Sequence, residues 1–238
     1  MFTIREYAMP ETLDEAYTIL KSRKGNQILG GCAWLRLGKK RINIAVDLTK
    51  CGLDYIREDD EQIEIGAMTS YRSVETCDIL KKYFNGVIAD SVSSIIGTQF
   101  RNTVTVGGSV YGRFGFSDFL TPLLALDTSV VLYKRGSISL ETFMTMPYEK
   151  EIIEKIVIKK DGRKSSYQMF RNSRGDFPIL NLAASRTEVG QWIVTVGARG
   201  PKAIRAKKTA AFLSDKLSQN ALKAEDVEAV IQEAGEIL

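Results

Sequence analysis

Strand-like and helix-like patterns of hydrophobic residues alternate along the first 52 residues of the chain. Three apolar runs typical of strands lie at residues 2–7, 27–29 and 42–48. After the first run, Pro10-Glu11-Thr12 is a typical helix start. Apolar residues then recur at the i, i+3, i+4 and i+7 positions of an amphipathic helix, namely Leu13, Ala16, Tyr17 and Leu20. This order predicts a small βαβ unit that spans residues 1–52.

The pattern becomes mixed between residues 53 and 164. Residues 62–66 alternate between polar and apolar, and residues 129–133 form an apolar run, so both segments are expected to be strands. Helical patterns lie at residues 73–83, 87–97 and 118–126. A second subdomain of the α+β type is therefore expected here.

Residues 165–238 form a third section. Three strand-like runs, at residues 167–170, 179–186 and 192–198, predict an antiparallel sheet. Helices are predicted to follow from Thr209 and from Ala224, the second with an apolar face made of Val227, Val230, Ile231 and Ala234. This section is expected to be a small C-terminal α+β domain.

The composition narrows the classes of function. With 44% hydrophobic residues among 238, the chain can bury a substantial core. Its 33 basic and 29 acidic residues are scattered, so neither nucleic acid nor a membrane surface is an expected partner. No apolar stretch reaches the roughly 18 residues of a membrane span, and the N-terminus lacks the layout of a signal peptide. We therefore expect a cytoplasmic protein.

The chain has no histidine and only three cysteines, Cys32, Cys51 and Cys77. Without histidine, Ser-His-Asp and Cys-His catalysis and nearly all first-row metal sites are excluded. The cysteines form no CxxC motif, which argues against a disulfide framework and against an iron–sulfur or zinc site. Any chemistry is therefore expected to come from a bound cofactor.

Two pairs of glycines are the strongest candidates for a cofactor site. Gly30 and Gly31 follow the apolar run 27–29, and Gly107 and Gly108 follow a second short apolar stretch. A Gly-Gly step carries no Cβ and permits positive φ, so successive N–H groups can converge on a phosphate. One such pair alone is most often a turn. Two pairs predict two backbone cradles for one ligand that carries a diphosphate.

The glycine pairs belong to a longer series of motifs. The first pair ends a βαβ unit, and the second ends the segment Gln99-Phe100-Arg101-Asn102-x-x-Thr105-x-Gly107-Gly108, which precedes Ser117-Asp118-x-Leu120-x-Pro122. Over essentially the whole chain, this series resembles the FAD-binding medium subunit of the molybdenum hydroxylases, the family of xanthine dehydrogenase and carbon monoxide dehydrogenase. The resemblance implies an α+β protein with the two-subdomain FAD-binding fold of the p-cresol methylhydroxylase type, in residues 1–52 and 53–164. A small C-terminal domain of the carbon monoxide dehydrogenase flavoprotein type, with a three-stranded antiparallel sheet and helices, is then expected in residues 165–238.

The resemblance also implies which residues contact non-covalently bound FAD. The diphosphate is expected on the backbone of residues 29–33 and 105–109. The cofactor-binding residues expected in these two segments are Ile28, Leu29, Gly30, Gly31, Cys32, Ala33 and Trp34, and Thr105, Val106, Gly107, Gly108 and Ser109. Asp118 is expected to accept a hydrogen bond from a ribose hydroxyl, and Ile95 and Ile153 are expected to pack against the isoalloxazine ring. Gln168 stands where xanthine dehydrogenase has a lysine near the flavin.

Four positions have a structural alternative. Ile95 and Ile153, taken without the resemblance, are typical core residues. Asp118 could instead cap the helix that begins at Phe119, because aspartate is a common N-cap residue. Arg101 could contact phosphate or could hold its loop through backbone carbonyls.

The resemblance implies a role in electron transfer. In this family a large molybdopterin-binding subunit oxidises the substrate, and two [2Fe–2S] clusters in a small subunit carry electrons to FAD. This chain is then expected to be an oxidoreductase subunit that does not act on substrate by itself and that passes electrons to NAD or another acceptor. Two alternatives stay open: a stand-alone flavin reductase on the same fold, as in the cell-wall enolpyruvyl-glucosamine reductases, and a flavin-free assembly subunit.

Overall fold

The N-terminal section forms a three-stranded parallel sheet in a computed structural model that describes residues 1–217 and residue 232. The strand order is β1-β3-β2, with β1 at Thr3–Ala8, β3 at Arg41–Asp47 and β2 at Gln27–Leu29. Helix α1 (Leu13–Ser22) connects β1 to β2 and contacts β3, and Thr12 caps it by accepting from the N–H of Glu15. The strands and the helix predicted from the sequence are confirmed, and β3 is the central strand.

A five-stranded antiparallel sheet supports the central section. Its order is β4-β5-β8-β6-β7, with β4 at Ile56–Glu58, β5 at Gln62–Gly66, β8 at Ile153–Lys159, β6 at Thr128–Leu132 and β7 at Gly136–Ser139. The sequence predicts β5 and β6 but not the other strands. Strands β4 and β7 are edge strands of three and four residues, too short to show a period. In β8 the alternation is interrupted near Ile153, where its pairing with β6 shifts register.

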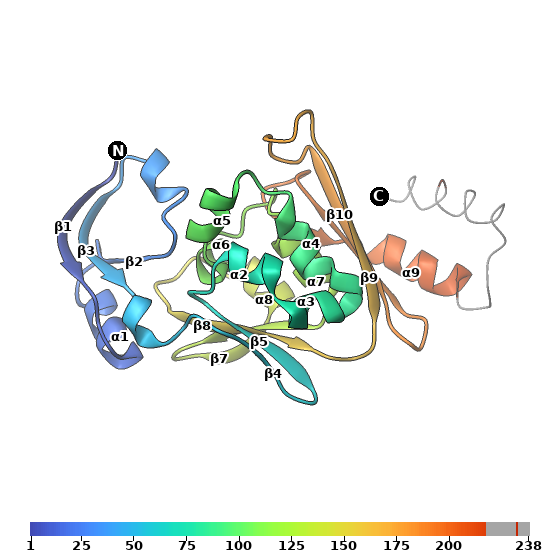
Figure 1. Cartoon of the computed structure of the whole chain (residues 1–238), viewed down its shortest axis with the longest axis horizontal. Helices are drawn as coiled ribbons and strands as arrows, with labels where there is room; N and C mark the ends of the chain where they lie inside the picture. Colours follow the sequence, from blue (N-terminus) through green and yellow to red (C-terminus); the bar gives the residue numbers. More distant parts are fainter. Residues whose placement is uncertain (218–231, 233–238) are drawn as a thin grey trace.

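Short helices lie over this sheet (Figure 1). They are α2 (Tyr71–Thr76), α3 (Asp78–Lys82), α4 (Val87–Ser93), α5 (Thr98–Thr103), α6 (Val106–Gly112), α7 (Leu120–Ala125) and α8 (Leu140–Thr145), together with the short turn η3 (Phe84–Gly86). Two further short turns, η1 (Leu35–Leu37) and η2 (Thr49–Cys51), belong to the N-terminal section. Among the described residues, none of the helices has the length and apolar character needed to cross a bilayer.

The helices are shorter than the sequence pattern predicts. The predicted helix over residues 73–83 is divided at Cys77, whose extended backbone (φ −69°, ψ 120°) separates α2 from α3. The predicted helix over residues 87–97 ends at Ser93, and Gly97 has a positive φ of 69°. The chain therefore turns at both places, and residues 94–97 become a loop.

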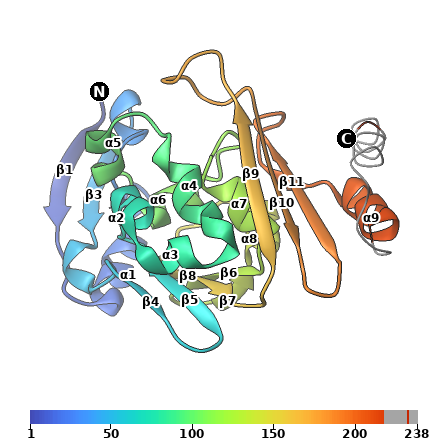
Figure 2. The same cartoon turned by 45° about the vertical axis from the view of Figure 1, so that its right-hand side comes forward.

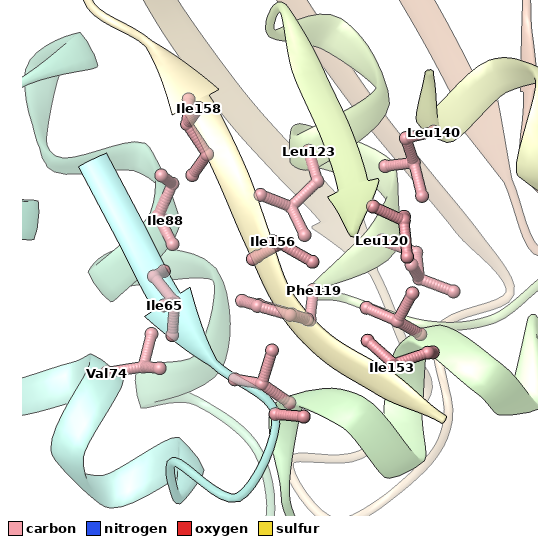
Figure 3. Close-up of a cluster of buried hydrophobic side chains, with 14 of the residues drawn as sticks. Ile65, Val74, Ile88, Phe119, Leu120, Leu123, Leu140, Ile153, Ile156 and Ile158 are labelled. Atoms are coloured by element: carbon pink, nitrogen blue, oxygen red, sulfur yellow. The ribbon is translucent and has the colours of Figure 1, made fainter. Parts of the chain in front are cut away.

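The main core lies between the five-stranded sheet and these helices (Figure 3). Phe119 is among its largest fully buried side chains, and Ile153 is 6% exposed within it. Figure 3 shows strand residues beside helix residues in this core, namely Ile65, Ile156 and Ile158 with Val74, Ile88, Leu120, Leu123 and Leu140. Burial of these aliphatic side chains supplies the main stabilising free energy of the central section.

The C-terminal section forms an antiparallel sheet of four strands, not the three predicted. Its order is β12-β11-β10-β9, with β12 at Ile204–Arg205, β11 at Trp192–Gly197, β10 at Leu180–Arg186 and β9 at Lys164–Phe170. The extra strand, β12, has only two residues and therefore no readable pattern. Figure 2 shows β9, β10 and β11 side by side, with α9 (Lys207–Lys216) beyond them. The helix predicted from Ala224, with its apolar face of Val227, Val230, Ile231 and Ala234, lies outside the described residues.

Helix α7 joins the C-terminal sheet to the central section. The Thr195 hydroxyl donates to the carbonyl of Thr121 at 2.8 Å, and Arg205 Nε donates to the carbonyl of Leu124 at 2.9 Å. The last carbonyls of a helix lack intrahelical partners, so the bond from Arg205 satisfies a group that would otherwise be unpaired. The two bonds attach β11 and β12 to α7.

Candidate functional site

A cleft of about 670 Å³ runs between the N-terminal and central sections. Its walls come from three parts of the chain, within residues 27–40, 71–118 and 171–177. The first two parts lie near each other in Figure 1, where the loop after β2 approaches α5 and α6. The volume is within the range of about 300–1,000 Å³ that is usual for ligand pockets.

Gly30 and Gly31 allow the two walls of the cleft to touch. A Cβ on Gly31 would lie 1.5 Å from the carbonyl oxygen of Thr103, and a Cβ on Gly30 would lie 2.8 Å from Thr105 Oγ1 and 3.3 Å from the Gly108 Cα. At Gly31 no side chain fits without moving the backbone, and at Gly30 a side chain would displace the Thr105 hydroxyl. The two glycine pairs are therefore side by side, as the two-cradle hypothesis requires.

The loop after Gly31 offers unpaired backbone donors. The N–H groups of Cys32, Ala33 and Trp34 have no hydrogen-bond partner in the part of the chain that the structure describes, and all three residues line the cleft. Cys32 has a left-handed φ of 55°. Successive free N–H groups around such a residue form the concavity that binds anions in many proteins.

The Cys32 side chain carries no negative charge beside these N–H groups. Its Sγ donates to the carbonyl of Gly30 at 3.2 Å. Burial raises the pKa of the thiol, with a smaller contribution from the Asp47 carboxylate. The thiol is therefore protonated at neutral pH, and no thiolate repels a phosphate here.

The second glycine pair does not supply a matching set of free N–H groups. The N–H of Val106 donates to the carbonyl of Thr69 at 2.9 Å, and the N–H of Gly107 donates to the carbonyl of Ala67 at 2.7 Å. A Cβ on Gly107 would lie 2.7 Å from the Cβ of Ala67. Neither Val106 nor Gly107 lines the cleft. Contrary to the expectation of a second N–H cradle, Gly107 is required for packing.

In the second segment, residues 105–109, the hydroxyl-bearing residues Thr105 and Ser109 line the cleft instead. Thr105 caps α6, and its Oγ1 accepts from the N–H groups of Gly108 at 3.3 Å and of Gly31 at 3.4 Å. An oxygen that accepts two bonds still has its own hydrogen to donate. Ser109 also lines the cleft, with its hydroxyl donating to the Thr105 carbonyl at 3.0 Å.

Asp118 lies at the cleft with its side chain almost fully buried. Its Oδ1 accepts from the hydroxyl of Tyr167 and, at 2.9 Å, from Arg171 Nη2. Burial raises the pKa of Asp118, although the Tyr167 hydrogen bond and the Arg171 charge oppose this effect. The capping role is taken by Ser117, whose Oγ accepts from the N–H of Leu120 at 3.2 Å. The helix-capping alternative for Asp118 is therefore wrong.

Four aromatic rings gather on the cleft wall. Trp34 lies 5.0 Å from Phe114, 5.3 Å from Phe116 and 5.4 Å from Phe177, measured between ring centroids. Phe114 and Phe116 stack at 17°. Sequence reasoning missed these phenylalanines, and the only local signal is the Phe114-Gly115-Phe116 step between two motifs. The cluster gives the cleft an apolar aromatic surface that suits a ring system.

Of the two roles considered for Arg101, phosphate contact and a structural role in its loop, the structure supports the structural role. Its guanidinium group forms a two-point ion pair with Glu75, at 2.8 and 3.1 Å, and donates to the carbonyl of Ile95. Arg101 is 8% exposed and does not line the cleft. It therefore positions the loop that carries Ile95 instead of contacting a ligand.

The structure brings most of the predicted site residues to the cleft. Those that line it are Ile28, Gly30, Gly31, Cys32, Ala33, Trp34, Ile95, Thr105, Gly108, Ser109 and Asp118. Leu29, Val106, Gly107 and Ile153 do not. Ile153 belongs to the main core on β8, because it lies on a strand between two neighbours and faces the helices (Figure 3). Gln168 is exposed on β9 and does not line the cleft either.

Basic side chains follow the first loop along the same wall. Arg36, Lys39 and Lys40 line the cleft, and none forms an ion pair within the described residues. Such cations raise the local potential and favour an anionic ligand. Among the described residues, no group of three or more His, Cys, Asp or Glu residues could hold a metal ion.

Comparison with known families identifies the chain. The matching family is described as the FAD binding domain in molybdopterin dehydrogenase, and the match covers residues 2–160. The chain belongs to this family. The resemblance seen in the motifs is thereby confirmed, FAD is the cofactor, and the chain is a subunit of an oxidoreductase.

Several relatives are dehydrogenase subunits. The glyceraldehyde dehydrogenase medium chain of Sulfolobus acidocaldarius is 26% identical over 191 residues, which cover 74% of this chain and 68% of the relative. The 6-hydroxypseudooxynicotine dehydrogenase complex subunit alpha of Paenarthrobacter nicotinovorans is 24% identical over 231 residues, which cover 88% of this chain and 78% of the relative.

Solved structures share the fold. A chain of carbon monoxide dehydrogenase from Hydrogenophaga pseudoflava has a TM-score of 0.82 at 22% identity, with 100% of this chain and 86% of that chain covered. A chain of quinoline 2-oxidoreductase from Pseudomonas putida 86 has a TM-score of 0.84 at 20% identity, with the same coverage of 100% and 86%. The α+β fold class is therefore confirmed.

The cleft has the groups that FAD requires. Free N–H groups at Cys32, Ala33 and Trp34 suit a diphosphate, and the absence of a Cβ at Gly30 and Gly31 keeps the loop close to the opposite wall. The aromatic cluster suits a planar ring system, and the buried carboxylate of Asp118 suits a sugar or ribityl hydroxyl.

Proposed function

We propose that this chain is the electron-transfer subunit of a molybdenum hydroxylase and holds FAD in the cleft. A small partner subunit with [2Fe–2S] clusters supplies the electrons, after a large molybdopterin-binding subunit has oxidised the substrate. NAD or another external acceptor removes them. The observation that supports this proposal is a built cofactor cleft in a chain without histidine, in whose described residues no metal-ligand cluster occurs.

When bound, FAD supplies the oxidation–reduction chemistry, and the protein supplies binding and orientation. The N–H groups of Cys32, Ala33 and Trp34 donate to the diphosphate in this proposal, and the Thr105 hydroxyl donates from the opposite wall. Arg36, Lys39 and Lys40 add positive potential beside them. Contacts to Leu29, Val106 and Gly107 are not part of the proposal, because these residues do not line the cleft.

One end of FAD lies against Ile95 and Asp118 in this arrangement. Arg171 Nη2 donates both to Asp118 and, at 3.3 Å, to Ser94 Oγ, so Asp118 and Ile95 belong to the same end of the cleft. The carboxylate accepts from a ligand hydroxyl there, and Ile95 packs on the adjoining ring. The loop over residues 171–177 completes this end, so the C-terminal domain proposed for residues 165–238 takes part in the site.

The proposal is tested in two steps. The chain is first purified alone, and its flavin is released by acid and identified by chromatography. We expect stoichiometric FAD in the supernatant and none in the precipitate. A protein that binds no flavin even when FAD is supplied would favour the assembly subunit instead.

The second step separates the electron-transfer subunit from a stand-alone reductase. The chain is co-expressed with a large molybdopterin-binding subunit and a small [2Fe–2S] subunit of a molybdenum hydroxylase, and flavin reduction is followed by absorbance after substrate is added. We expect reduction only in the complex, because the described residues of this chain provide no substrate-oxidising metal site. Substrate turnover by the purified chain, in proportion to its concentration, would contradict the proposal.

A further inference from the structure

Arg171 connects three segments of the cleft wall. It follows β9, and its guanidinium group donates to Asp118 Oδ1 at 2.9 Å, to Ser94 Oγ at 3.3 Å and to the carbonyl of Asp176 at 3.2 Å. The side chain is 9% exposed, and that of Asp118 is 8% exposed. The matched family segment ends at residue 160, so this contact comes from outside it.

The pair leaves one carboxylate oxygen for a ligand. Both side-chain donors, Tyr167 and Arg171, reach Asp118 Oδ1, and neither reaches Oδ2. Because Asp118 lines the cleft, Oδ2 is the oxygen available to a ligand hydroxyl. Arg171 thus fixes the orientation of the carboxyl group as well as its charge.

The charge of Asp118 depends on this arginine. A buried carboxylate without a cation nearby is strongly disfavoured and tends to take up a proton. The other titratable groups that face Asp118 are Tyr71 and Tyr167, and burial raises the pKa of both, so both are neutral near pH 7. Arg171 is therefore the cation that keeps Asp118 ionised.

We infer that Arg171 is the positioning residue of the FAD site: it holds Asp118 ionised, with one oxygen presented to a ligand hydroxyl, and ties the Ser94 loop and the C-terminal domain to this end of the cleft. The inference rests on the proposed binding of FAD in the cleft. It assigns to the C-terminal domain a direct part in cofactor affinity.

The test compares FAD affinity in Arg171→Met, Arg171→Lys and wild-type protein from pH 6 to 8, measured by flavin fluorescence on the flavin-free chain. Loss of a charged hydrogen-bonding partner costs about 1.5–3 kcal/mol, which corresponds to about tenfold to hundredfold weaker binding in Arg171→Met. Its affinity falls further as the pH is lowered, because Asp118 then takes up a proton. The FAD affinity of the wild-type protein is expected to be independent of pH over this range. Arg171→Lys is expected to recover much of the affinity and its independence of pH.

Two controls separate positioning from folding. Arg174→Met removes an exposed arginine of the same loop and leaves affinity and pH profile unchanged. In Asp118→Asn, the further change Arg171→Met adds no pH dependence, because no carboxyl remains to titrate. Wild-type protein without FAD affinity would contradict the proposed function. If the wild-type protein binds FAD and Arg171→Met binds it equally well, with an affinity that does not change with pH, only the inference about Arg171 is overturned.

Discussion

The backbone N–H of Gly31 donates a hydrogen bond of 3.4 Å to the hydroxyl of Thr105, 74 residues further along the chain. The same hydroxyl accepts from the N–H of Gly108 at 3.3 Å. One side chain therefore joins both glycine pairs, and the position of the N–H groups after Gly31 depends on it. This link explains how two distant glycine motifs become one site.

Replacement of Thr105 tests this link. Thr105→Val leaves two N–H groups unpaired in a partly buried position, and we expect a loss of about 1–3 kcal/mol in the free energy of unfolding. FAD affinity falls as well, because the loop after Gly31 is released. Thr105→Ser keeps the hydroxyl and preserves both properties. Urea unfolding and flavin titration provide the measurements, and equal behaviour of the Val and Ser variants would contradict the role of the hydroxyl.

The glycines of the two pairs are expected to respond differently to alanine. Gly107→Ala places a Cβ 2.7 Å from the Cβ of Ala67, within the central section, and lowers the melting temperature of the flavin-free protein. Gly108→Ala meets Thr105 Oγ1 at 3.0 Å at the cleft and acts mainly on FAD affinity. Thermal unfolding with and without FAD distinguishes the two effects. A Gly107→Ala protein with unchanged stability would show that this glycine is not required for packing.

The sequence was sufficient for the features that depend on local pattern. The βαβ unit, β5, β6 and the two glycine pairs have periodicity or motif signals within a few residues, and the structure contains them. Strands β4, β7 and β12 are too short for such a signal. A local pattern could not reveal that the N–H of Gly107 is satisfied by the carbonyl of Ala67 and the N–H of Gly108 by the hydroxyl of Thr105.

The parts of the site that sequence reasoning missed come from distant positions. Tyr167 and Arg171 meet Asp118 across 49 and 53 residues. Ile153 illustrates the opposite error, because an isoleucine on a central strand and one on a cleft wall look the same in sequence. Burial of Ile153 in the core is decided by the packing of β8, which only the fold defines.

Trp34 provides a direct signal for cofactor binding. It lines the cleft, whereas the other tryptophan, Trp192, lies on β11 and does not. We expect FAD to quench most of the fluorescence of Trp34 when it enters the cleft. The quenching persists in Trp192→Phe and is largely lost in Trp34→Phe, measured at saturating FAD with excitation at the tryptophan band. The reverse pattern would place FAD elsewhere.

Cys32 gives an independent footprint of the ligand. Its thiol lies in the cleft loop, and burial raises its pKa, so alkylation is slow at neutral pH and accelerates as the pH rises. Bound FAD should protect Cys32 further. Cys51, which does not line the cleft, serves as the internal control, and its labelling is expected to be independent of FAD. Peptide mapping after maleimide treatment measures the labelling of Cys32 and Cys51 separately. If saturating FAD leaves the labelling rate of Cys32 unchanged, the proposed position of the diphosphate is contradicted.

The ion pair between Glu75 and Arg101 is expected to make stability depend on pH. Burial raises the pKa of Glu75, but the hydrogen bonds and charges of Arg101 and Arg72 outweigh it and hold the pKa below its usual range. A carboxyl group whose pKa is lower in the folded state stabilises the protein above its unfolded pKa of about 4.3. This contribution is lost as the pH falls through the folded pKa.

Glu75→Gln therefore lowers the free energy of unfolding by about 1–3 kcal/mol at pH 7, and the difference from wild type shrinks as the pH falls from 5 to 3. Because Arg101 also donates to the carbonyl of Ile95, the variant loosens the cleft wall and weakens FAD binding. Glu11→Gln is the matched control and changes stability little, since the Glu11 side chain is 75% exposed and forms only a surface ion pair, at 3.3 Å, with Lys50. Urea unfolding at several pH values tests the prediction. A Glu75→Gln deficit that stays constant down to pH 3 would mean that the lost free energy comes from packing and not from the carboxylate charge.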